Sequence, residues 1–163
     1  MLDSLRLIVR DLRLSAREAE RVARITGAQL FVLQQLHDGG TLSLGELAER
    51  TMTDQSSVSV VVKKLVSAKL VARKPSKADA RRLELSLTPA GKKLLARCPE
   101  PTQVRLVAAL KRLAPNEVDG LTSGLSALVR EMGLESDAPA PLFFEDVGAQ
   151  RRHPRDKSRR TRA

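Results

Sequence analysis

Aromatic residues and cysteine are scarce in this sequence, and each shortage excludes a class of function. The chain has no Trp, no Tyr and three Phe. Stacking of unpaired bases on aromatic side chains is therefore a poor explanation for any binding of nucleic acid. Cys98 is the single cysteine, so neither an intrachain disulfide nor a multi-cysteine metal site can form.

Long hydrophobic runs are also missing. Apolar runs such as residues 58–62, which Ser59 interrupts, are far shorter than the roughly 20 residues of a membrane-spanning helix. The N-terminus reaches Asp3 and Arg6 before any signal-like apolar stretch can form. We therefore expect a soluble, cytoplasmic protein that does not bind membranes.

The sequence contains no pattern typical of catalysis. No nucleophile with a base, no pair of carboxylates and no Gly-rich phosphate loop can be assembled from the spacing of its residues. His37 and His153 are isolated from other ligand types, which argues against a metal site. We expect no enzymatic activity, no catalytic residues, no metal and no cofactor.

Positive charge is abundant and unevenly distributed. Lys and Arg number 29 against 19 Asp and Glu, and the net charge of +10 indicates a polyanionic partner such as nucleic acid. Six of these ten charges belong to residues 151–163, and the Pro- and Ala-rich residues 135–141 before them read as a linker. We predict one domain, residues 1–134, followed by a linker and a disordered basic tail, residues 135–163.

One apolar cluster interrupts this polar C-terminal region. Leu142, Phe143 and Phe144 follow the linker directly. Two interpretations remain open for them: docking on the dimer core or on a partner, and a short hydrophobic spot in a disordered segment.

Helical patterns fill the first third of the chain. Leu2, Leu5, Val9 and Leu12 recur at spacings of three and four, which predicts an amphipathic helix ending near Ile25. Capping boxes follow at Thr26–Gln29 and Ser43–Glu46. They predict a second helix to about residue 38, ended by Gly39 and Gly40, and a short third helix to about Thr51.

The next helix has a buried stripe and a polar face. Thr53 or Asp54 can cap it, and its apolar positions are Val58, Val61, Val62 and Leu65. The other face carries Gln55, Ser56, Ser59, Val60 and Lys63. Two short helices joined by a tight turn, the second with a polar and basic outer face, are typical of a helix-turn-helix.

A hairpin and further helices complete the predicted fold. Residues 70–74 and 83–87 read as two strands joined by a loop, and together they would form a wing. Thr88 and Pro89 open a helix that Pro99 and Pro101 must interrupt, and Pro115 opens a last helix. The fold class is mainly α with a small β-hairpin, an α+β winged helix-turn-helix.

The hairpin carries the most specific motif of the chain. Residues 79–91 read D-A-R-R-L-E-L-S-L-T-P-A-G, which matches D-x-R, five residues, then L-T-x-x-G. This motif resembles the wing of the MarR (multiple antibiotic resistance regulator) family of transcriptional regulators, and residues 44–48 and 57–65 resemble the family's paired helices. The resemblance covers roughly residues 1–134. It implies a DNA-binding lobe at 26–91 and dimerisation helices at 1–25 and 92–134.

Two residues depart from the family's pattern. Lys69 stands just past the recognition helix, where the family usually has a glycine with positive φ. Val60 stands where a polar or basic residue is common.

The resemblance and the helix pattern together give a set of candidate DNA-binding residues. Side chains at the N-terminal end of the recognition helix would contact base edges and its backbone amides would contact phosphate, while Lys63 and Lys64 would contact phosphate. The resemblance further implies that Arg81 enters the minor groove and that Asp79 orients the wing loop. Capping, ordinary solvation or a surface ion pair are the alternatives. The set is Gln55, Ser56, Ser57, Ser59, Val60, Lys63, Lys64, Arg73, Lys74, Lys77, Asp79, Arg81 and Arg82.

Two functions fit these expectations. The first is a homodimeric, nucleoid-associated regulator that binds a palindromic operator, a repressor whose small-molecule effector would be bound between the dimer helices and the DNA-binding lobes. The alternative is an architectural protein of low sequence preference, which the basic tail and Val60 favour. Cys98 follows the wing, whereas the oxidant-sensing cysteine of some family members lies near the N-terminus, so we expect a structural role for it.

Overall fold

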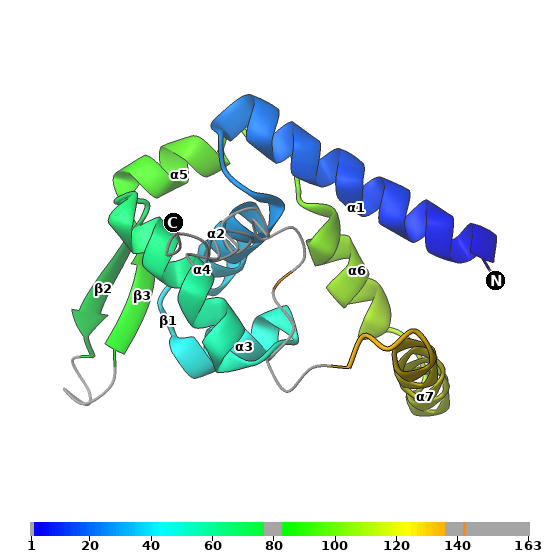
Figure 1. Cartoon of the computed structure of the whole chain (residues 1–163). Helices are drawn as coiled ribbons and strands as arrows, with labels where there is room; N and C mark the ends of the chain where they lie inside the picture. The colour runs from blue at the N-terminus through cyan, green and yellow to red at the C-terminus, as the bar shows by residue number, and fades with distance from the viewer. Residues whose placement is uncertain (1, 77–82, 136–141, 143–163) are drawn as a thin grey trace, which may run out of the picture.

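The computed structural model describes residues 2–76, 83–135 and 142 of the chain (Figure 1). Within these ranges the chain is mostly helical, with one small sheet. The helices are α1 (Leu2–Ala23), α2 (Gly27–Gly39), α3 (Leu44–Thr51), α4 (Gln55–Ser67), α5 (Pro89–Leu95), α6 (Thr102–Leu110) and α7 (Pro115–Glu131). The strands are β1 (Leu42–Ser43), β2 (Val71–Pro75) and β3 (Leu83–Leu87). The predicted fold class is confirmed.

Capping boxes set the start of two helices, as predicted. The Thr26 hydroxyl accepts from the Gln29 amide at 3.2 Å, and the Gln29 side chain accepts from the Thr26 amide at 2.9 Å. Ser43 and Glu46 repeat the arrangement at 3.2 and 2.7 Å. Each box satisfies two amides that a helix N-terminus would otherwise leave unpaired.

The sheet is antiparallel with strand order β1-β3-β2. Val71 pairs with Leu87 and Pro75 with Leu83, so β2 and β3 form the predicted hairpin. Leu42 of β1 pairs with Leu85 on the other side of β3. The two-residue β1 was not predicted, because a strand this short has no visible period.

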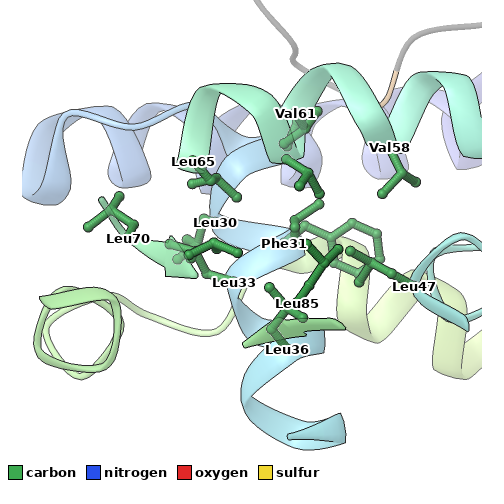
Figure 2. Close-up of a cluster of buried hydrophobic side chains, with 14 of the residues drawn as sticks. Leu30, Phe31, Leu33, Leu36, Leu47, Val58, Val61, Leu65, Leu70 and Leu85 are labelled. Atoms are coloured by element: carbon green, nitrogen blue, oxygen red, sulfur yellow. The ribbon is translucent and has the colours of Figure 1, made fainter. Parts of the chain in front are cut away.

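The core lies between α2 and α4 (Figure 2). Leu30 and Leu33 of α2 and Val58, Val61 and Leu65 of α4 are completely buried. Figure 2 shows the three α4 side chains pointing toward α2, with Leu47 of α3 and Leu85 of β3 at the edge of the same cluster. This packing fixes the rotation of α4 about its axis, and therefore which of its residues face outward.

The first and last helices extend away from this core (Figure 1). α1 buries Leu12, Ala16 and Ala19, and its N-terminal half is exposed. The Arg105 guanidinium lies 2.6 Å from the Asp11 carboxylate, so an ion pair joins α6 to α1. No residue of α7 is buried within the chain.

The C-terminal half contains the predicted break. α5 ends at Leu95 and α6 begins at Thr102, with Pro99 and Pro101 between them. Leu142, beyond α7, is 6% exposed and belongs to the core cluster, which favours docking over a solvated spot at that residue. Phe143 and Phe144 lie outside the described residues.

Within the described ranges, no helix combines the length and the apolar character that crossing a bilayer requires.

Candidate nucleic-acid interface

A tight turn joins α3 to α4. Met52 has a left-handed φ of 53°, and its N–H donates to the carbonyl oxygens of Ala48 and Glu49, which ends α3. Of the two predicted caps, Asp54 is the residue that caps α4. The turn places α4 beside α3 as the second helix of a helix-turn-helix.

Asp54 collects the polar groups of the first turn of α4. Its carboxylate accepts from the Ser57 amide at 2.9 Å, from the Ser57 hydroxyl at 2.7 Å and from the Ser56 hydroxyl at 2.5 Å. These hydrogen bonds hold the pKa of Asp54 well below its usual range, so the group is ionised at neutral pH. A fixed negative charge therefore occupies the helix N-terminus, which argues against the expected phosphate contact with its amides.

Of two other candidates at this end, Ser57 turns inward and Gln55 is exposed beside α3. Ser57 is buried, and its hydroxyl donates to Asp54, so its side chain serves as part of the cap. The amide nitrogen of Gln55 would lie 3.2 Å from a Cβ placed on Gly45, which puts the Gln55 side chain over α3. Ser57 is therefore not among the candidate residues that are exposed for DNA binding.

The outward face of α4 lies further along the helix. Ser56, Val60, Lys63 and Lys64 are exposed and Ser59 is half-buried. All are on the side away from Val58, Val61 and Leu65, which Figure 2 shows facing the core. The result is a small, polar and basic surface with one valine in it.

The described part of the wing continues this surface. Arg73 and Lys74 of β2 are exposed. A shallow pocket of about 230 Å³ separates α4 from the sheet, and Ser59, Lys63, Arg73 and Leu83 are among its lining residues. Lys77, Asp79, Arg81 and Arg82, the predicted wing-loop contacts, lie outside the described residues.

The end of α4 explains part of the sequence motif. Lys69 has a left-handed φ of 59°, the conformation expected where the family has glycine. The Thr88 hydroxyl donates to the carbonyl oxygen of Lys69 at 2.8 Å and accepts from the Gly91 amide at 3.0 Å. A Cβ at Gly91 would overlap the carbonyl oxygen of Leu70. The Thr and Gly of the motif therefore clamp α5 onto the end of α4, a structural role that sequence reasoning did not assign.

Cys98 is half-buried and lies just beyond the C-terminal end of α5. Burial raises the pKa of its thiol, and the nearby Arg97 lowers it by a smaller amount. The Cys98 thiol lies 3.5 Å from the carbonyl oxygen of Leu94. A raised pKa favours the unreactive thiol form, in agreement with the expected structural role.

Residues 25–82, which hold α2 to α4 and β2, match the sequence model of the MarR family. Two curated relatives from Bacillus subtilis are similar over overlapping lengths. The transcriptional repressor MdtR is 40% identical over 67 residues, or 41% of this chain and 43% of MdtR. The uncharacterised regulator YfiV is 30% identical over 104 residues, or 64% of this chain and 65% of YfiV. Over these segments the chain is similar to regulators of the MarR family.

Solved structures of MarR proteins have the same fold. A mutant MarR from E. coli in complex with operator DNA aligns with a TM-score of 0.51 and 24% identity, over 76% of this chain and 91% of that one. The aligned segments span less than two thirds of the length of MdtR and of YfiV.

Proposed function

We propose that this protein is a MarR-family regulator of transcription that binds double-stranded DNA sequence-specifically and acts as a homodimer. The observation that carries the proposal is the outward face of α4, where exposed Lys63 and Lys64 flank Val60 on a helix fixed against α2 and α3. A helix presented in this way fits the major groove of duplex DNA. The similar fold of a MarR protein bound to operator DNA supports this orientation.

Each candidate residue has a role in the proposed complex. Ser56, Ser59 and Val60 face base edges. Gln55 also reaches a base edge when its side-chain amide rotates away from Gly45. Lys63, Lys64, Arg73 and Lys74 contact phosphates on either side of the groove. From the wing motif, Arg81 enters the adjacent minor groove, Asp79 orients the loop, and Lys77 and Arg82 contact the backbone.

The dimer is supported by apolar side chains that the single chain leaves exposed. Leu2 and Leu5 on α1 are 58% and 41% exposed, and Leu121, Leu125 and Leu128 on α7 are 41%, 46% and 43% exposed. Leu12 is already buried within the chain, so the proposed interface uses the N-terminal part of α1. If these exposed leucines were buried against a second copy of the chain, the two α4 helices of the dimer would be related by two-fold symmetry. Such a pair of helices suits the two half-sites of a palindromic site.

A cavity at the junction of α1 and the lobe supports an effector. It measures about 470 Å³, a volume suited to a small molecule, and Val22, Leu70 and Leu94 are among the side chains that line it. Arg24, Lys93 and Arg97 also line it. An apolar site with three cations suits an aliphatic anion, and binding there would alter how α1 and α5 hold the lobe.

Selection from a random pool of duplex DNA tests the proposal. Full-length protein should enrich one motif with two-fold symmetry, and footprinting should show protection of both half-sites. Recovery of sequences without any shared motif would contradict the proposal and support the architectural alternative.

A further inference from the structure

The polar groups of α4 that usually read bases are largely committed within the protein. The Ser56 and Ser57 hydroxyls donate to Asp54, and the Gln55 amide lies over Gly45. In the first turn of α4 the two serine hydroxyls are thus engaged by Asp54, while the Gln55 side chain is exposed. The middle of the helix is a further place where α4 can contact base edges.

Val60 is the exposed apolar residue at that point. It is 44% exposed, one turn after Ser56 and one turn before Lys63 and Lys64, so all four side chains lie along the same face. Its neighbours Val61 and Val62 are buried in the core. Val60 thus forms a single apolar spot ringed by hydroxyl and ammonium groups, which is too small to dock another protein.

A thymine methyl group matches this surface. Among the base edges in the major groove, the 5-methyl group of thymine is the apolar feature, while the other groups are hydrogen-bond donors or acceptors. Lysines one turn away would contact the flanking phosphates and keep the valine close to the groove floor. A phosphate or a polar base edge would instead lose hydration against Val60 without a hydrogen bond in return.

We propose that Val60 contacts the 5-methyl group of one thymine in each half-site of the operator and thereby determines sequence preference at that position. This inference rests on the proposed function. It specifies that recognition includes a methyl contact at the centre of α4, where a family pattern would have a polar or basic side chain.

Replacement of thymine by deoxyuracil tests the contact, because the two bases differ only by the 5-methyl group. The probe is a duplex recovered from a random pool with the wild-type protein, with each thymine replaced singly by deoxyuracil. At one thymine per half-site, wild-type affinity should fall about fourfold, the ratio expected for one buried methyl group. The Val60→Ser variant should bind the thymine and deoxyuracil duplexes equally well.

Two controls separate this contact from a general loss of fold or affinity. Val60→Ser should melt at nearly the wild-type temperature, because the side chain is exposed and lies outside the core. Val60→Thr, which keeps one methyl group at nearly the same volume, should show an intermediate sensitivity to deoxyuracil.

The possible failures are distinguishable. If a motif is enriched but no deoxyuracil replacement weakens wild-type binding, the Val60 contact is overturned and the proposed function stands. The same holds if Val60→Ser retains the full sensitivity of the wild type. If the pool yields no shared motif, the proposed function fails and this inference fails with it.

Discussion

Lys69 occupies a backbone conformation that suits glycine better than lysine. Its φ of 59° puts the backbone in the left-handed region. In this region the Cβ of an ordinary residue crowds the following carbonyl oxygen, which costs roughly 1–2 kcal/mol. Glycine avoids that cost but adds entropy to the unfolded chain, which offsets part of the gain. Lys69→Gly should therefore raise the free energy of unfolding by up to about 1 kcal/mol in urea denaturation. Lys69→Ala, which keeps a Cβ, should bring no gain, and equal values for the two variants would contradict this account.

Asp54 should make stability depend on pH. Because its pKa is lowered by folding, its carboxylate stabilises the folded chain above the unfolded pKa of about 3.9, and this contribution is lost as the pH falls through the folded pKa. Asp54→Asn keeps a capping oxygen without the charge. The melting temperature of the wild type should exceed that of the variant above about pH 5, and the difference should shrink below about pH 4. A constant difference across this range would show that ionisation of Asp54 contributes nothing.

Sequence reasoning at the residue scale was right about the core and incomplete about the surface. The stripe of Val58, Val61, Val62 and Leu65 follows from helical periodicity, and all four are buried. The inward turn of Ser57 and the position of the Gln55 amide beside Gly45 depend on where Asp54 and Gly45 lie in space. A one-dimensional pattern cannot show that the cap Asp54 engages the hydroxyls of both Ser56 and Ser57.

At the scale of elements, the junction between α4, β2 and α5 depends on Gly91. A Cβ there would overlap the backbone of Leu70, and backbone cannot move aside cheaply. Gly91→Ala should lower the free energy of unfolding by about 1–3 kcal/mol. Gly120→Ala in α7 is the matched control, since an added Cβ there meets no atom within 4 Å, and it should stabilise the chain by about 0.5–1 kcal/mol. Similar effects of the two substitutions on the free energy of unfolding would contradict the close packing proposed at Gly91.

The wing loop has its own test. If Arg81 enters the minor groove, Arg81→Ala should reduce affinity for a recovered duplex severely while leaving the melting temperature nearly unchanged. The loss should be greatest on duplexes with A/T-rich flanks, where the narrow groove attracts arginine most strongly. Equal affinities of the wild type and the variant for duplexes with every flanking sequence would show that Arg81 does not contact the DNA.

The elements themselves were largely predictable. Capping residues Thr26, Ser43 and Thr88 gave the starts of α2, α3 and α5, and Pro99 and Pro101 gave the break before α6. The strand β1 was not predicted because its two residues are a strand only through pairing with β3, about forty positions later in the sequence. Capping residues and prolines predict where a helix begins or ends, because they act on neighbouring residues. The pairing of strands that are distant in the sequence can be seen only in the folded structure.

At the scale of the whole molecule, exposed leucines predict a dimer that a single charge should break. Leu125→Glu on α7 should shift sedimentation at micromolar concentration from about twice 17.9 kDa toward that mass, because burial of an unpaired carboxylate is costly. Val60→Glu is the matched control: Val60 is 44% exposed against 46% for Leu125, but it lies on α4, and this variant should remain a dimer. A wild type that sediments as a monomer would contradict the dimer and the palindromic site.

The sequence preference of the protein for DNA can be measured by an equilibrium competition. A recovered duplex, labelled and bound by full-length protein at physiological salt, is displaced by the same unlabelled duplex or by random-sequence duplex of equal length. Random duplex should compete at least about 10³-fold more weakly than the recovered duplex, as for other specific DNA-binding proteins. Displacement by both duplexes at similar concentrations would contradict a sequence-specific regulator, because the basic surface would then bind DNA through its phosphates alone.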